Sequence, residues 1–172
     1  DHALSKMAAA MESTPNAWLM GAHLLNADGS EQRGGRRKLM TPSNAIAESL
    51  WLYRLMGWER MNEHNAPLPE VVAELDAISG AFMFFRKEKY DQLSGMDEQY
   101  FLHVEDMDIC RRVKESGGKI YFVPEVKVVH LRSTSKVSSG FLEWQKLQGF
   151  IVYFRKFYGA TVWLPIAAGL FL

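Results

Sequence analysis

Apolar and polar positions alternate along the chain with two different periods, and the period changes at glycine, proline and polar clusters. Between residues 4 and 11 apolar side chains recur at i, i+3, i+4 and i+7, which predicts a short amphipathic helix. Residues 18–25 form a short apolar run, which predicts a strand, and Asn26-Ala27-Asp28-Gly29 predicts a turn after it. A second helix is expected to begin at Thr41-Pro42, an N-cap residue followed by proline, and to continue to about residue 56.

The middle of the chain predicts a buried strand and two helices. Residues 77–85 are too apolar for a half-exposed strand, so we expect a central strand that Ser79-Gly80 interrupts. A short helix is expected over residues 86–93. A longer helix is expected from the acidic stretch at residue 105 to Glu115-Ser116, where Gly117 would follow its end.

The last third of the chain predicts strands followed by a long helix. Residues 119–123 and 126–131 predict two strands that Pro124 separates. Residues 141–158 predict an amphipathic helix rich in aromatic side chains, and Gly159 would end it. The whole pattern therefore indicates an α/β fold, with a mixed sheet flanked by helices.

Composition narrows the class of protein. The chain has 172 residues, which suits one domain, and 48% of them are hydrophobic, which is ample for a core. Basic and acidic residues balance, so the net charge of zero gives no case for nucleic-acid binding. The single cysteine, Cys110, excludes an internal disulfide and a zinc site of several cysteines, and a reducing compartment fits best.

Both ends of the sequence suggest a piece of a longer protein. The chain opens Asp1-His2 with neither an initiator methionine nor a signal peptide, and it stops inside an apolar run. Residues 159–172 are too few to span a bilayer, which needs about 20. They could begin a membrane anchor, lie in the membrane interface or form a buried helix, and we expect a C-terminal amphipathic or apolar helical segment.

Basic residues cluster between Arg33 and Lys38, beside Gly34-Gly35. Such a cluster is most simply a solvated loop. The alternative is a contact to phosphate or to anionic lipid.

An acidic stretch carries the strongest candidate chemistry. Glu105, Asp106 and Asp108 lie at the expected start of a helix, where the helix dipole stabilises anions. Asp108 and Arg112 are spaced i, i+4 and can form an ion pair. Glu105 and Asp106 have no cation within helical reach, and an ionised but unpaired carboxylate suits a general base. The stretch alone favours a structural helix start over a catalytic site, because acidic residues are common there.

A longer set of motifs extends this stretch. In order along the chain, they are Ser79-Gly80-Ala81-Phe82-Met83, Arg86, Gly95-Met96-Asp97-Glu98, Glu105-Asp106-Met107-Asp108 with Arg112, Gly118-Lys119-Ile120-Tyr121, Pro124 and His130. The ordered set resembles the second half of a bacterial family 2 glycosyltransferase. It is most similar to rhamnosyltransferase-like members that build O-antigen, capsule or cell-wall saccharides, and it favours the catalytic interpretation of the acidic stretch.

The resemblance implies a fold and a reaction. It implies that residues 1–158 are the acceptor-side part of a GT-A fold and that 159–172 are a separate apolar segment. The reaction implied is an inverting transfer from a nucleotide-sugar, such as a dTDP-rhamnose-like donor, to a saccharide or lipid-linked acceptor. A divalent metal, Mg or Mn, would assist, and the site would be cytoplasmic, at the inner face of the cell membrane. The family's nucleotide-binding half is not in this sequence, so we expect the chain alone to be inactive.

The same resemblance assigns roles to individual residues. Asp106 corresponds to the general base, and His130 to a histidine that ligates the metal in several members. The remaining assignments are acceptor binding for Glu105, Ser79, Gly80 and His103, and structural support of the site for Asp108 and Arg112. The alternative from another class is a non-catalytic glycosyltransferase-like module that binds saccharide or a membrane partner.

Overall fold

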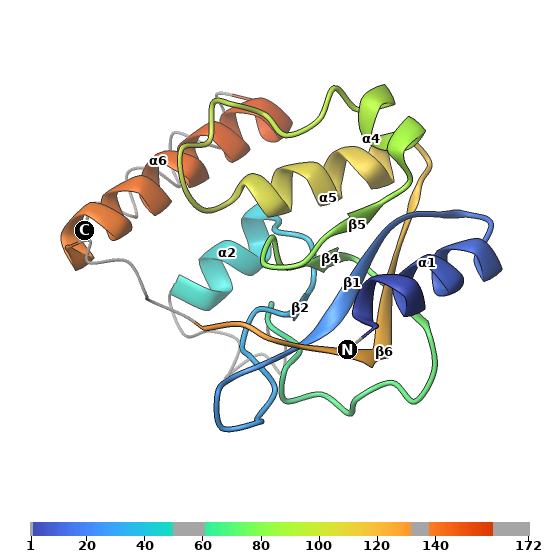
Figure 1. Ribbon diagram of the computed structural model, residues 1–172. Coiled ribbons are helices and arrows are strands. Elements are labelled where there is room, and N and C mark those ends of the chain that lie inside the picture. The colour runs from blue at the N-terminus through green and yellow to red at the C-terminus, as the bar shows by residue number, and fades with distance from the viewer. Residues whose placement is uncertain (1, 50–60, 132–137, 160–172) are drawn as a thin grey trace.

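The computed structural model describes residues 2–49, 61–131 and 138–159. It shows an α/β fold in which helices cover both faces of a mixed sheet (Figure 1). The four-stranded sheet has the order β3 (Ala73–Leu75), β6 (Lys119–Val129), β1 (Ala17–Leu25) and β5 (Phe84–Phe85). The expected mixed sheet is confirmed, because β1 and β6 are parallel whereas β3 and β5 pair antiparallel with their neighbours.

A second, smaller sheet lies beside the first. It pairs β2 (Arg36–Arg37) with β4 (Ala77–Ile78), with Arg37 opposite Ala77. This short ladder fixes the position of Arg37 at the edge of the region that the acidic stretch occupies.

Two apolar clusters fill the space on the two faces of the main sheet. Helix α1 (Ala3–Ser13) covers one face, where Met7 and Met11 pack with Met20 of β1. Helix α5 (Glu105–Glu115) covers the other face, with Leu19 and Ile120 beneath it. The alternation of Leu19 and Met20 between the two clusters is the period of two that a strand requires.

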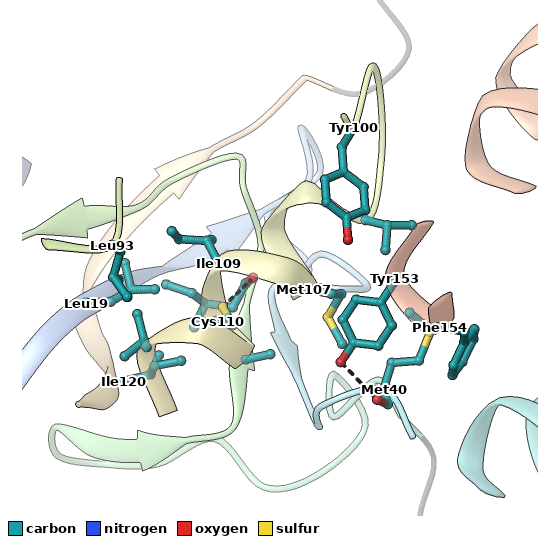
Figure 2. Packing of buried hydrophobic residues seen from close by; sticks show 14 residues of the cluster. Leu19, Met40, Leu93, Tyr100, Met107, Ile109, Cys110, Ile120, Tyr153 and Phe154 are labelled. Carbon is teal, nitrogen blue, oxygen red and sulfur yellow. Dashed lines mark hydrogen bonds between the residues drawn. The ribbon is translucent and has the colours of Figure 1, made fainter. Parts of the chain in front are cut away.

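Helix α6 (Ser139–Tyr158) packs on the outer side of α5. Figure 2 shows Met107 of α5 facing Tyr153 and Phe154 of α6, and the Tyr153 hydroxyl donates to the Met40 carbonyl at 3.0 Å. The core therefore joins the sheet, α5 and α6, and it lies directly behind the start of α5.

The helices begin within two residues of the positions that the sequence indicated. Helix α2 (Pro42–Ser49) starts after Thr41, whose Oγ1 accepts from the Asn44 amide at 3.2 Å. Ser138 caps α6 through a 3.4 Å hydrogen bond from the Phe141 amide. The short helix expected over 86–93 is α4 (Lys87–Gln92). The expected extension of α2 to residue 56 lies outside the described residues.

The single central strand expected over residues 77–85 is wrong. The chain forms β4, leaves the ladder at Ser79-Gly80 and re-enters the main sheet as β5. The Ser79 amide donates to the Gly35 carbonyl at 3.2 Å. The Phe82 amide donates to the Ser79 carbonyl at 3.4 Å, which closes a turn. The run is apolar because both of its ends pack into the cores, although it is not one strand.

The two strands expected on either side of Pro124 are one strand, β6. Its register against β1 shifts between Val123 and Lys127, which stand opposite the consecutive residues Ala22 and His23. This irregularity accommodates a proline that cannot donate to the ladder.

The apolar C-terminal segment expected at 159–172 lies outside the described residues from residue 160 onward. Among the helices of the described part, none combines the length and the apolarity that a membrane span needs. The boundary expected at residue 158 stays a prediction.

Candidate functional site

The start of α5 is held by a backbone in an unusual conformation. His103 and Val104 precede the helix with φ values of 66° and 71°, which side chains other than glycine rarely adopt. Such residues cost about 1–3 kcal/mol each and persist only where the surrounding structure holds them. Val104 is buried against α6 at Gly149, where a Cβ would lie 2.9 Å from the His103 carbonyl oxygen. The close packing of α6 therefore fixes the direction in which Glu105 and Asp106 leave the loop.

Asp106 has a cationic partner that the sequence does not indicate. Arg37 donates from Nη2 to Asp106 Oδ2 in a short ion pair, and the Gly80 amide donates to the same oxygen at 3.1 Å. The expectation that Asp106 is unpaired is therefore wrong, because the pairing residue lies 69 positions away and β2 brings it to the site.

The second oxygen of Asp106, Oδ1, has different surroundings from Oδ2. Oδ1 is buried and has no hydrogen-bond partner, whereas both donors act on Oδ2. An unsatisfied buried acceptor is costly, by about 1–3 kcal/mol, and it is uncommon enough to need an explanation. The arrangement leaves Oδ1 as an acceptor that is withdrawn from solvent and has no hydrogen-bond partner.

Gly80 lies over both carboxylates. It is exposed, and a Cβ there would lie 3.3 Å from Asp106 Cβ and 3.7 Å from Glu105 Oε1. A side chain larger than alanine would therefore cover the carboxylates from the solvent side. Ser79, the preceding residue, uses its Oγ to accept from the Ala81 amide at 3.2 Å, which shapes the turn. The structure thus brings Ser79, Gly80, Glu105 and Asp106 together, as the sequence interpretation required.

Glu105 occupies a less polar environment than its neighbour. Its Oε2 is buried without a partner, and burial raises the pKa of the carboxyl above its ordinary value, with a smaller contribution from the charge of Asp106. Adjacent carboxyls in such different surroundings are suited to different roles, one held by arginine and one easier to protonate. His103 is exposed on the loop before them, and its charge opposes the rise in the Glu105 pKa.

Asp108 is a structural residue, and its expected pair with Arg112 is confirmed. Arg112 Nε donates to Asp108 Oδ2 at 2.6 Å, and the Asp108 side chain is fully buried. Its other oxygen accepts from Lys156 of α6 at 2.6 Å and from the Tyr100 hydroxyl at 3.1 Å. Lys156 also reaches Asp97 at 2.6 Å. Asp108 therefore ties α5 to α6 and to the loop that carries His103.

His130 lies at the end of β6, where its ring faces Gln32. The amide of Gln32 donates from Nε2 to the His130 carbonyl at 2.9 Å and to Asn26 Oδ1 at 3.1 Å, which leaves Gln32 Oε1 as an acceptor. His130 Nδ1 is 2.7 Å from that oxygen, so Nδ1 carries the proton. In a neutral ring this hydrogen bond selects the tautomer with a lone pair on Nε2, which is the form in which an imidazole ligates a metal.

The described residues do not complete a metal site around His130. No group of three or more histidine, cysteine, aspartate or glutamate side chains that could hold a metal occurs among residues 2–49, 61–131 and 138–159. Within the described residues, the hydrogen bonds of His130 run to Gln32 and to Leu25 and do not reach Asp106. The tautomer fits a metal ligand, and any further ligands would come from outside this part of the chain.

Within the basic cluster at residues 33–38, Arg36 is neither solvated nor free to bind phosphate. Arg36 is buried, binds Glu31 through two hydrogen bonds of 2.7 and 3.0 Å and donates to the carbonyls of Ala66 and Pro67. Both expectations for Arg36 are wrong, since it fastens the 61–69 loop to the sheet. Arg37 is the functional candidate that the sequence missed, and no local signal marks it, because its partners come from β4 and α5.

Comparisons with known proteins match the part of the chain that contains this candidate site. Residues 36–148 match the family model described as glycosyltransferase like family 2. A rhamnosyltransferase of Escherichia coli K12, WbbL, is 28% identical over 72 residues, which are 41% of this chain and 27% of that protein. An N-acetylglucosaminyl-diphospho-decaprenol L-rhamnosyltransferase of Mycobacterium tuberculosis is 33% identical over 58 residues, which are 34% of this chain and 19% of that protein.

The matches therefore span about a quarter and a fifth of these relatives. The matched region of the family model contains Arg37, Gly80, both carboxylates and His130, and it extends over most of the described chain. The chain belongs to the glycosyltransferase like family 2.

Proposed function

We propose that this chain is the acceptor-side part of an inverting glycosyltransferase in which Asp106 is the general base. In this reaction Asp106 Oδ1 accepts the proton of an acceptor hydroxyl, and the hydroxyl oxygen attacks the anomeric carbon of the donor. The bond from that carbon to the diphosphate breaks, and the nucleoside diphosphate leaves from the opposite face. One base facing the anomeric carbon suffices for an inverting displacement.

The anchored carboxylate of Asp106, which lies beside the exposed Gly80 and whose Oδ1 has no hydrogen-bond partner, is the observation that carries the proposal. Arg37 and the Gly80 amide both engage Oδ2, so the carboxylate is fixed while the lone pairs of Oδ1 are unused; because Oδ1 is buried, the acceptor would have to displace the atoms that cover it. A general base needs both properties: a fixed position and a free lone pair within hydrogen-bond reach of the proton it takes. Glu105 and Ser79 would then contact the acceptor beside Gly80, with His103 on the loop before the helix.

The donor and acceptor follow from the relatives. Both are named rhamnosyltransferases, so we propose a nucleotide-sugar donor of the dTDP-rhamnose type. The name of the mycobacterial relative includes a diphospho-decaprenol, which is a lipid carrier, so a saccharide on a lipid is the proposed acceptor. Such an acceptor would place the reaction at the inner face of the cell membrane, in the synthesis of cell-surface polysaccharide.

The proposal includes a divalent metal, Mg or Mn, for which His130 Nε2 would be one ligand. The metal would neutralise the charge of the leaving diphosphate. In the full-length protein, His130→Ala is expected to raise the metal concentration needed for half-maximal turnover, because one ligand is lost. A metal titration of the variant that superimposes on that of the wild type would return His130 to a structural role.

The central test is Asp106→Asn in the full-length protein that contains this chain, assayed with a dTDP-rhamnose donor and a lipid-linked saccharide acceptor. Loss of the base is expected to lower kcat by about 10²–10⁴-fold, because that is the range of general-base catalysis. Asp91→Asn is the matched control, because Asp91 lies in an exposed ion pair on α4. Turnover of Asp106→Asn within tenfold of the wild type would remove Asp106 as the base.

One observation favours a non-catalytic module instead. The ion pair with Arg37 gives Asp106 a structural partner within the fold, so its charge is explained without a reaction. A module of this kind would bind saccharide without transferring sugar. Saccharide binding by calorimetry, without any release of nucleoside diphosphate in the full-length protein, would establish that alternative.

A further inference from the structure

We infer that Arg37 is a positioning residue that fixes the orientation of the Asp106 carboxylate through its Oδ2. This inference rests on the proposed function of Asp106 and adds a residue that the sequence interpretation placed among solvated or phosphate-binding side chains. Arg37 acts through Asp106 and does not need to touch donor or acceptor.

The position of the guanidinium is fixed before it reaches Asp106. The backbone of Arg37 is held in the β2–β4 ladder opposite Ala77, and Nη2 donates to the Ile78 carbonyl at 3.1 Å. The same nitrogen donates to Asp106 Oδ2. Because one nitrogen bridges a strand carbonyl and the carboxylate, the small sheet and the start of α5 are joined through Arg37.

The two oxygens of the Asp106 carboxylate accept different numbers of hydrogen bonds, which fits a positioning role for Arg37. Two donors, Arg37 Nη2 and the Gly80 amide, converge on Oδ2, and Oδ1 has none. A purely structural arginine would more commonly form the bidentate fork, with one N–H to each oxygen. Arg36, one position earlier, does form that fork with Glu31, and no site is proposed there.

The side chain of Arg37 is also largely withdrawn from solvent. It is 17% exposed, and its Nε is buried without a partner. The single bridging nitrogen therefore limits rotation of the carboxylate about its own axis. Loss of Arg37 would leave Asp106 with only the Gly80 amide as a donor, so the carboxylate could turn and the geometry of proton transfer would be lost.

The experiment compares Arg37→Ala and Arg37→Lys in the full-length protein, with the donor and acceptor named above. Arg37→Ala is expected to lower kcat about a hundredfold, since a misplacement of about 1 Å can have that effect. The KM values for donor and acceptor are expected to stay close to those of the wild type, because Arg37 contacts neither. Arg37→Lys keeps the charge without the bridging geometry, and we expect an intermediate kcat.

Chemical rescue separates positioning from folding. Added guanidinium or methylguanidinium at millimolar concentration is expected to restore part of the kcat of Arg37→Ala, because the ion can occupy the vacated space beside Oδ2. Arg155→Ala, at an exposed arginine on α6, is the matched control and should neither lose activity nor respond to guanidinium. Circular dichroism and thermal melting of each variant would show whether it is folded.

Three outcomes would overturn the inference. An unchanged kcat in folded Arg37→Ala, alongside an inactive Asp106→Asn, would overturn it while leaving the proposed function intact. A raised KM for the donor with an unchanged kcat would assign Arg37 to the diphosphate. Full activity of Asp106→Asn would overturn both the inference and the proposed function, so the two failures are distinguishable.

Discussion

Two neighbouring carboxylates show how much a residue depends on its surroundings. Glu105 and Asp106 are adjacent, similar in chemistry and at the same helix start. Asp106 is bound by Arg37 and by the Gly80 amide, whereas Glu105 is half-buried and burial raises its pKa. Sequence spacing identified both as special and could not tell them apart, because their distinction comes from β2 and from the turn at Gly80.

The raised pKa of Glu105 predicts how the stability of the protein depends on pH. Burial raises its pKa in the folded protein, so below the ordinary value of 4.5 its contribution to stability is fully present. That contribution is lost as the pH rises through the raised value, because the folded protein must then bury a charge. Glu105→Gln is therefore expected to be more stable than the wild type at neutral pH, and the difference is expected to shrink as the pH falls through the raised value towards 4.5.

Urea unfolding at several pH values between 4 and 7.5 would measure this difference. Glu115→Gln on the same helix is the control, because Glu115 is half-exposed and pairs with Arg111 in an i, i+4 ion pair. The control should be neutral or slightly destabilised at every pH. A Glu105→Gln variant that is less stable than the wild type at neutral pH would mean that the carboxylate has a stabilising partner.

At the scale of elements, the acidic helix is held in place by contacts that cross the chain. The expected Asp108–Arg112 pair lies within α5, and the sequence indicated it correctly. The contacts to Lys156 and Tyr100 join α5 to α6 and to the preceding loop, and no local pattern indicates them. The strained His103-Val104 backbone is tolerated because α6 carries Gly149 at the point of closest approach.

Asp108→Asn is expected to destabilise the protein by about 3 kcal/mol, because breaking a buried ion pair leaves the other charges without compensation. The matched control is Asp91→Asn, which removes a similar i, i+4 pair with Lys87 on α4. Asp91 is 55% exposed whereas Asp108 is fully buried, so the control should cost less than about 0.5 kcal/mol. Chemical denaturation of both variants measures the difference, and equal losses would show that burial does not govern these pairs.

At the scale of the whole molecule, the helices were predicted better than the strands. Each of the expected helices that lies within the described residues is present, because amphipathic spacing and capping residues are local signals. The apolar run at 77–85 divides between two sheets, and the two strands expected around Pro124 merge into one. Strand partners are distant in sequence, so a run of apolar residues does not state which sheet it joins.

The sequence by itself determined the α/β class, the acidic helix start, the candidate carboxylates and the resemblance to a family, which the family match confirms. Those properties depend on residue type and on spacing along one segment. Only the tertiary structure decided that Asp106 is held by Arg37, that Gly80 lies over both carboxylates and that one oxygen is left free. These features arise where β2, the turn after β4 and the start of α5 meet, and their geometry is set by packing between segments that no local pattern connects.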